Sequence, residues 1–227
     1  MTYDPRTIAF VAELLFPPMQ LRADLVQGVH NSLFRQPQLG YQSFQVQADG
    51  IHLTNLAQVP GQVSQASFQP DRLVVREELR GTTVEDFATR LVNVAKTAFA
   101  ALSIPASMAQ QFCVRSLINP KQVRDAREFL GRRLLANGEA LQELGRPLQS
   151  LGLRLSLPPV EGDRAAWQAR IETWPQDPRS LWIEVTSTFP TPLTLDQLPQ
   201  VADHLYATYG FLTGPLSRYL ERHDRPA

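Results

Sequence analysis

The spacing of apolar residues divides the first half of the chain into strands and helices. Apolar and polar residues alternate over residues 8–16, as they do in a half-buried strand, and the alternation ends at Pro17-Pro18. Over residues 19–36 an apolar residue returns at every fourth position, which predicts the buried side of a helix. Four shorter alternating segments then predict strands at residues 41–47, 51–56, 62–68 and 72–79.

Turn and capping residues set the limits of the next elements. Asp49-Gly50 is a strong hairpin signal and predicts the turn between the first two short strands. Thr83 predicts the N-cap of a helix over residues 84–103, with Asp86 as an acidic group at its third position. The first half of the chain therefore has the order strand, helix, four strands, helix.

The second half of the chain repeats this order of elements. An alternating segment at residues 109–118 predicts its first strand, and Asn119-Pro120 predicts the start of a helix that ends near residue 136. An extra helical segment at residues 139–150 has no counterpart in the first half. The remaining elements are three strands and a final helix, at residues 152–157, 165–174, 180–189 and 195–222.

A short sequence match supports an internal duplication. The stretch FCVRSLINPKQVR, residues 112–124, has Phe, Leu, Pro, Gln and Arg at the same places as FVAELLFPPMQLR, residues 10–22, at an offset of 102 residues. The agreement in element order supports the duplication further. We therefore predict an α+β fold in a single domain, residues 1–227, built from two pseudo-repeats over about residues 8–103 and 109–222.

The two predicted halves can join into one antiparallel sheet. Each half-sheet has helices on one face only, so its edge stays free to pair with the other half. The simplest closure pairs the two opening strands about a pseudo-two-fold axis. We expect Glu13 of the first strand to lie opposite Arg115 of the second strand, where opposite charges stabilise the pairing.

The composition excludes several classes of partner. Of the 227 residues, 43% are hydrophobic and 19% are charged, which is ordinary for a packed globular protein. Lys plus Arg equals Asp plus Glu at 22 each, so no overall field attracts nucleic acid or an anionic membrane. The N-terminus has no signal-peptide pattern, and no run of residues is apolar enough to span a bilayer. We therefore expect a cytoplasmic protein.

The residues with catalytic or metal-binding chemistry form no recognised motif. The four histidines, His30, His52, His204 and His223, have no metal-ligand spacing, and no hydrolase, P-loop or dinucleotide-binding motif occurs. The single cysteine, Cys113, favours a small buried strand residue over a reactive thiol. We therefore expect neither a metal nor a cofactor, and the odds of an enzymatic function are lowered.

Polar side chains gather on the face of the predicted sheet opposite the helices. This set mixes arginine, glutamate and tryptophan, and Trp and Arg together are enriched at binding hot spots. Two interpretations are open: a solvated face joined by cross-strand ion pairs, or a binding surface. The candidate binding residues are Glu13, Arg76, Arg115, Arg154, Arg170, Glu172, Trp182 and Glu184.

Two further segments are candidates for contacts. Residues 115–133 carry six basic and two acidic side chains, which fits either phosphate contacts or the solvated face of a helix with i,i+4 ion pairs. The final helix has more apolar and aromatic residues than one core stripe needs, so it is a candidate homodimer contact. Gly210 and Gly214-Pro215 predict a bend or a break in that helix.

Two short motifs suggest a family. VAELLFPP, residues 11–18, and VRSLINP, residues 114–120, resemble a sporadically distributed bacterial family of uncharacterised α+β proteins of similar length. In that family an early strand ends at prolines and a mid-chain strand ends in an Ile-Asn pair. The family's Arg-Tyr-Ile-Asn motif is only partly present here, and the resemblance implies no reaction. The duplicated element order is also similar to the TATA-binding-protein-like saddle and to gyrase-inhibitor-like and haem-binding SOUL modules.

The sequence leaves two functional hypotheses. The first is a non-enzymatic protein–protein interaction or scaffold protein that uses the open sheet face or the C-terminal helix. The second is a small-molecule-binding protein with a pocket between the two halves. A flat, charged sheet face would favour the first hypothesis, and a cleft at the pseudo-two-fold axis would favour the second.

Overall fold

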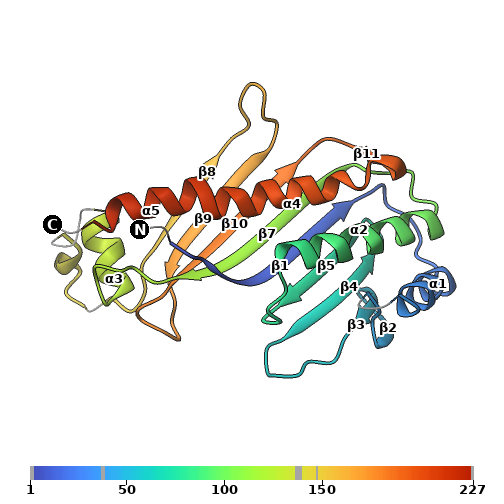
Figure 1. Ribbon diagram of the computed structural model, residues 1–227, viewed down its shortest axis with the longest axis horizontal. Helices are drawn as coiled ribbons and strands as arrows, with labels where there is room; N and C mark the ends of the chain where they lie inside the picture. The colour runs from blue at the N-terminus through green and yellow to red at the C-terminus, as the bar shows by residue number, and fades with distance from the viewer. Residues whose placement is uncertain (1–2, 37–38, 136–139, 147, 226–227) are drawn as a thin grey trace.

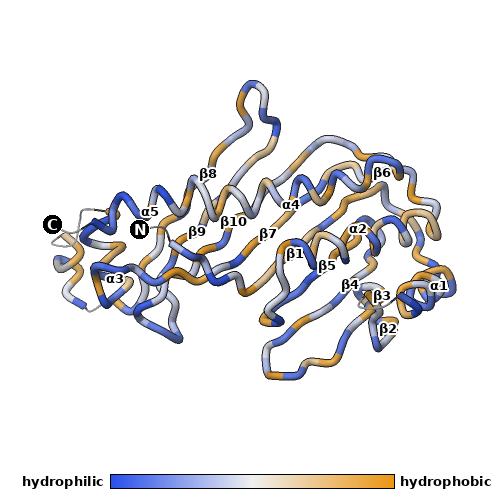
Figure 2. Tube along the Cα trace, in the orientation of Figure 1, coloured by the Kyte–Doolittle hydropathy of each residue, from blue (hydrophilic) through white to orange (hydrophobic). Residues whose placement is uncertain are grey.

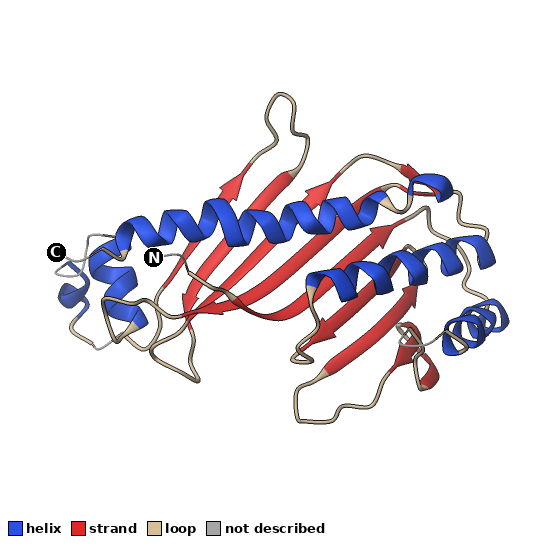
Figure 3. Cartoon of the chain, viewed as in Figure 1, coloured by secondary structure: helices blue, strands red, loops and turns tan. Residues whose placement is uncertain are grey.

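A nine-stranded antiparallel sheet runs through the molecule, and the helices lie on one of its faces (Figure 1, Figure 3). The structure is a computed structural model that describes residues 3–36, 39–135, 140–146 and 148–225. The predicted α+β fold with one antiparallel sheet is confirmed. Across the sheet the strands follow the order β2 (Ser43–Gln47), β3 (Gly50–Thr54), β4 (Val63–Gln69), β5 (Arg72–Glu78), β1 (Arg6–Leu15), β7 (Ala109–Ile118), β10 (Leu181–Phe189), β9 (Ala166–Thr173) and β8 (Gly152–Leu157).

Two long helical segments cover most of one face. Helix α2 (Val84–Ala101) covers the first half of the sheet, and α1 (Ala23–Phe34) packs against α2. Helix α4 (Gln200–Phe211) continues through the π-helical turn η4 (Leu212–Leu216) into α5 (Ser217–His223), over the second half. The shorter elements are α3 (Ala126–Glu128), η1 (Phe129–Leu134), η2 (Ala140–Leu144), η3 (Leu195–Gln197) and the strand pair β6 (Ala106–Ser107) and β11 (Leu193–Thr194). Among the helices in the described ranges, none is long and apolar enough to cross a membrane.

Both halves of the sheet have the same strand order. Strands β1 and β7 form the central pair, and each is the first long strand of its half. Outward from this pair, each half places its last long strand next and its earlier strands toward the edge, as β5-β4-β3-β2 on one side and β10-β9-β8 on the other. A duplication predicts this order, while the duplication itself stays a prediction.

The register of the central pair corrects the predicted charge pairing. Val11 lies opposite Cys113, and the offset of 102 residues makes the same two residues equivalent. In an antiparallel pair of duplicated strands, two equivalent residues lie opposite each other only where the pseudo-two-fold axis crosses the pair. This axis therefore passes between Val11 and Cys113. Glu13 and Arg115 lie on opposite sides of this axis, and Arg115 lies opposite Ala9. The expected pairing of Glu13 with Arg115 is wrong.

Alternate residues of the strands and the inner sides of α1, α2 and the α4–η4–α5 helix form the core. Phe10 of β1 is buried, and its ring stacks on Phe87 of α2 with ring centroids 5.3 Å apart. Thr83 caps α2 as predicted, since its hydroxyl accepts a hydrogen bond from the backbone N–H of Asp86 at 3.1 Å. Figure 2 shows apolar and polar positions alternating along the strands. Burial of the apolar set holds the helices on the sheet.

The helix predicted to start at Asn119-Pro120 begins later. The backbone N–H groups of Lys121 and Gln122, at the predicted start, donate to the Asp224 carboxylate at 2.6 and 3.1 Å, so no helix begins there. Asp125 is the N-cap instead, because its carboxylate accepts a hydrogen bond from the backbone N–H of Arg127 at 2.8 Å. Helical structure follows only as α3 and the π-helical η1, so the predicted start is wrong.

The extra helical segment predicted at residues 139–150 is helical over only part of its described residues. Its described part contains the 3₁₀ helix η2 and then extended or irregular backbone before β8. Gly145, with a φ of 65°, explains the end of η2, because glycine adopts this left-handed conformation without strain. Residues 136–139 and 147 lie outside the part of the chain that the structure describes.

The final helix continues past the two positions where a bend or a break was predicted. It is not broken at Gly210 or Gly214-Pro215, because the π-helical turn η4 accommodates Pro215, which has no N–H to donate. Its leucines face the core, whereas Tyr206 and Tyr219 are exposed on its outer side. A homodimer contact through these tyrosines stays a prediction.

Gly50 fixes the turn between β2 and β3. Its φ is 148°, and a Cβ atom there would lie 2.3 Å from the backbone oxygen of Phe68 on β4. We predict that Gly50→Ala lowers the free energy of unfolding by more than about 1 kcal/mol. Gly28 in α1 is the matched control, since a Cβ there meets open space and Gly28→Ala should stabilise the helix by about 0.5–1 kcal/mol. Urea unfolding compares the two variants, and equal effects would contradict the geometry.

His204 of α4 makes the stability depend on pH. Its ring stacks on Phe189 of β10 with centroids 4.0 Å apart, and burial lowers its pKa below the ordinary 6.5, although Asp203 acts in the opposite direction. As the pH falls below about 6.5, the unfolded chain binds the proton first and the free energy of unfolding decreases. We predict that His204→Phe reduces the fall in Tm between about pH 7 and pH 5. An unchanged fall would show that the His204 pKa is not lowered.

Candidate binding site on the open sheet face

The face of the sheet opposite the helices is called the open face. Its side chains alternate with the core residues of the same strands, and most of them are charged or polar. On β7, for example, Gln111, Cys113 and Arg115 face outward, while Phe112 and Val114 are buried. The packing of helices on the other face thus selects which residues reach the open face.

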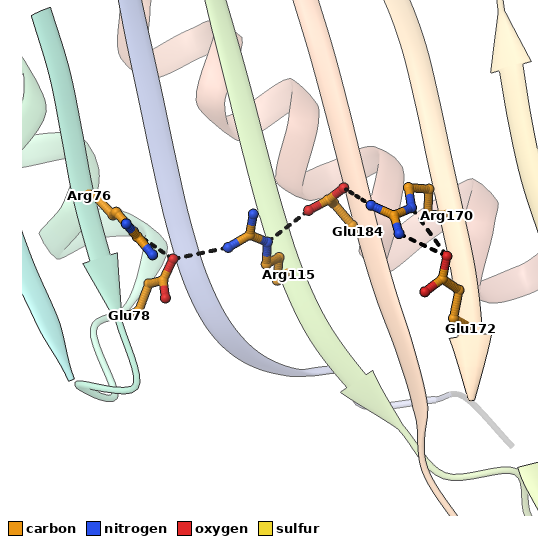
Figure 4. A network of polar contacts seen from close by, with 6 residues as sticks. All are labelled: Arg76, Glu78, Arg115, Arg170, Glu172 and Glu184. Carbon is orange, nitrogen blue, oxygen red and sulfur yellow. Dashed lines mark hydrogen bonds and ion pairs between the residues drawn. The ribbon is translucent and has the colours of Figure 1, made fainter. Parts of the chain in front are cut away.

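Six charged side chains form a continuous chain of ion pairs across the open face (Figure 4). At its centre the Arg115 guanidinium lies 3.0 Å from Glu78 and 2.8 Å from Glu184. On one side Arg76 lies 2.7 Å from Glu78. On the other side Arg170 lies 3.4 Å from Glu184 and 2.9 Å from Glu172. This set, drawn from β5, β7, β10 and β9, is called the open-face network: Arg76, Glu78, Arg115, Glu184, Arg170 and Glu172.

A small residue on β1 allows the network to cross the centre of the sheet. Strand β1 lies between β5 and β7, and Ala9 is opposite both Glu78 and Arg115. Because the Ala9 methyl group is short, the Arg115 side chain reaches Glu78 over β1 (Figure 4). A long side chain at this position would separate the ion pairs of the two halves.

The open-face network is neutral and partly buried. Its three arginines balance its three glutamates. The side chains of Glu78 and Glu184 are only 16% and 12% exposed, and each contacts two arginines. Burial alone would lower the pKa of Arg115, but the hydrogen bond to Glu184 and the nearby carboxylates raise it above its ordinary value. The charges therefore compensate each other within the sheet surface.

A pocket of about 990 Å³ lies beside the network, and Glu78, Arg115 and Glu172 are part of its lining. The start of β1 and the turn after β5 line one part of it, and β7, β9, β10 and the start of β8 line the rest. Trp174 and Trp182 are part of its wall, and the Arg170 guanidinium lies 5.1 Å from the centre of the Trp182 ring. Other lining residues are Arg6, Ile8, Leu79, Leu117 and Leu151. Both halves of the chain therefore contribute to the pocket.

Leu79 lines this pocket with a strained backbone. Its φ is 53°, and its side chain is 48% exposed. The left-handed conformation is unfavourable by roughly 1–2 kcal/mol for a residue with a Cβ atom. The Leu79 N–H donates to the backbone oxygen of Ile8 at 2.8 Å, which holds the turn against β1. Residues with a strained backbone cluster at functional sites.

The structure brings most of the predicted binding residues together. The open-face network contains Arg76, Arg115, Arg170, Glu172 and Glu184, and Trp182 lines the adjacent pocket. The other two candidates lie apart, since Glu13 pairs with Arg72 at 3.0 Å and Arg154 donates to Gln168 at 2.8 Å. The cross-strand ion pairs of the solvated-face interpretation are present. Binding of a partner to this face stays a prediction.

Sequence reasoning missed Arg6, Leu79 and Trp174. All three lie at or just beyond the ends of strands, where alternation no longer indicates which way a side chain points. One signal was available for Trp174, because a tryptophan directly before Pro175 sits at the end of a predicted strand. No comparable signal marked Arg6.

Two other candidates show ordinary surface or strand chemistry. In the basic segment, Arg132 pairs with Glu128 at the i,i+4 spacing at 3.2 Å, and Arg127 pairs with Asp125 at 2.5 Å. Cys113 is partly exposed on the open face rather than fully buried. Burial and the nearby Glu184 carboxylate raise the pKa of its thiol to about 12, so the thiol stays protonated at neutral pH.

The chemistry of the site is interpreted from its geometry alone. Over the described ranges, no group of three His, Cys, Asp or Glu side chains is arranged to hold a metal ion. Comparison of the sequence with protein-family models gives no match, and comparison with curated proteins gives none either. The family resemblance of VAELLFPP and VRSLINP therefore stays a prediction.

Arg115 should be energetically coupled to Glu184 and not to Glu13. We predict that Arg115→Gln and Glu184→Gln together cost less than the sum of the single changes, with a coupling of about 1 kcal/mol, because the pair is partly buried. The control pair, Glu13→Gln with Arg115→Gln, should be additive within about 0.5 kcal/mol. Urea unfolding of the single and double variants measures both couplings. Coupling between Arg115 and Glu13 would contradict the register of the central pair.

Proposed function

We propose that this chain is a non-catalytic binding protein that holds a small ligand in the open-face pocket. The observation that carries the proposal is the pocket of about 990 Å³ with two tryptophans in its wall, which both halves of the chain line. Ligand pockets commonly measure about 300–1,000 Å³ and combine apolar and aromatic walls with a few polar groups. This geometry favours the small-molecule hypothesis over the flat charged face that a protein partner would use.

The pairing of charges on the open face supports this choice. A charged partner gains specificity and association rate when its charges meet complementary, available charges. In the open-face network each glutamate already contacts at least one arginine. The pocket instead offers indole rings and the half-exposed residue Leu79, and removing their apolar surface from water on ligand binding is favourable.

A protein partner on the open face is the second candidate function. The described helices leave this face uncovered (Figure 3), and the side chains of Arg76 and Arg170 are each 42% exposed. A protein partner would contact these arginines, which lie outside the pocket lining. The two candidates therefore differ in whether residues outside the pocket contribute to binding.

The pocket should bind a neutral aromatic probe. We predict that N-phenyl-1-naphthylamine binds the native protein, and that Trp174→Ala and Trp182→Ala each weaken this binding about tenfold, because a ring contact is lost. Trp167→Phe is the matched control, since Trp167 lies away from the pocket and stacks on Phe211 at 5.0 Å. Fluorescence titration measures the probe affinity, and circular dichroism checks that each variant folds.

Leu79→Gly separates binding from stability in the same experiment. Glycine relieves the left-handed strain, so the free energy of unfolding should not fall, whereas the loss of the apolar side chain should weaken probe binding. Equal probe affinity for the native protein and all pocket variants would contradict the proposal. A protein from the native host that loses binding with Arg76→Ala and keeps it with Trp174→Ala would instead support the second candidate.

A further inference from the structure

We infer that the pocket takes an aromatic anion, a flat apolar ring system that carries a carboxylate, sulfonate or phosphate group. The inference rests on the proposed function, because it specifies the ligand of the same pocket. The anion-binding group is Arg6, and the ring-binding groups are Trp174 and Trp182.

A regular strand would point Arg6 away from the pocket. Side chains of a strand alternate between its two faces, so residues separated by an even number of positions share a face. Arg6 would then share the helix-covered face with Phe10, which is buried against α2.

A β-bulge in β1 turns Arg6 to the open face instead. The pairing of β1 with β7 shifts at Ile8, which has no partner in β7, and beyond the shift Arg6 lies opposite Leu117. Arg6 and Leu117 both line the pocket. Thr7 takes the covered side, where its hydroxyl lies 3.1 Å from that of the buried Ser116. Bulges commonly redirect a side chain next to a functional site, and this bulge places the Arg6 guanidinium at the pocket.

Arg6 is the uncompensated charge of the pocket. The other lining arginine, Arg115, pairs with two glutamates of the open-face network. The two lining carboxylates, Glu78 and Glu172, each contact a network arginine. In the part of the chain that the structure describes, no carboxylate lies within 4.0 Å of the Arg6 guanidinium. Arg6 is therefore available for a charge-assisted hydrogen bond to an anionic ligand group.

The two tryptophans favour a flat ring as the body of the ligand. The Arg170 guanidinium lies over the Trp182 ring at 5.1 Å, which orients the indole by a cation–π contact. Trp174 begins the turn between β9 and β10, and its backbone N–H donates to the Ser180 oxygen at 2.9 Å. Both tryptophans thus belong to the second half of the sheet, while Arg6 comes from the first strand. An aromatic ligand ring could make offset-stacked or edge-to-face contacts with these indoles, and such contacts are favourable.

Two probes that differ by one anionic group test the inference. 1-Anilinonaphthalene-8-sulfonate carries a sulfonate that N-phenyl-1-naphthylamine lacks. We expect the sulfonate probe to bind the native protein about tenfold more tightly than the neutral probe, and raised salt to weaken only the sulfonate probe. Arg6→Gln should abolish this preference, because it removes the positive charge that contacts the sulfonate. Arg6→Lys should retain part of the preference, because it keeps the positive charge.

Arg154→Gln is the control variant, since Arg154 lies on the edge strand β8 outside the pocket lining. It should bind both probes as the native protein does. Equal affinity of the native protein for the two probes, or a preference that persists in Arg6→Gln, would overturn the inference and leave the proposed function standing. If Trp174→Ala and Trp182→Ala change the affinity for neither probe, the proposed function fails, and the inference fails with it.

Discussion

The pairing of β1 with β7 is the interaction on which the rest of the structure depends. It joins the two halves into one sheet, and its register places Ala9 between Glu78 and Arg115. A slip of one residue would turn the outward side chains of one half toward the helices, and a slip of two would remove Arg115 from the reach of Glu78. Burial of Phe10 against Phe87 fixes the facing of β1, and the register then determines which charges meet.

The open-face network explains how so many charged residues share one sheet surface. Its two innermost carboxylates are largely removed from water, and a partly buried charge is tolerated only when an opposite charge lies beside it. Alternating signs across four strands satisfy this condition without any net charge. In the resulting surface each of the six charged side chains already contacts a side chain of opposite charge.

Two local departures from regular structure accompany the pocket. The bulge at Ile8 reverses which face of the sheet the side chains before it point to. Leu79, with its left-handed backbone, begins the turn after β5. A single hydrogen bond, from the Leu79 N–H to the Ile8 oxygen at 2.8 Å, joins the two. A regular sheet presents a smooth surface, whereas irregular backbone at a strand end can place a charged and an apolar side chain around one concavity.

The sequence by itself determined the elements, their facing and most of the charged surface. Alternation along β7 and β10 correctly placed Arg115, Glu184 and Trp182 on the open face, because side-chain direction in a regular strand depends only on neighbouring residues. Tertiary structure alone decided the register of β1 with β7, since several registers preserve the same alternation. It also decided the bulge that redirects Arg6 and the hydrogen bonds to Asp224 that use the backbone N–H groups at the predicted helix start. These outcomes depend on contacts between residues far apart in the chain, which no local pattern records.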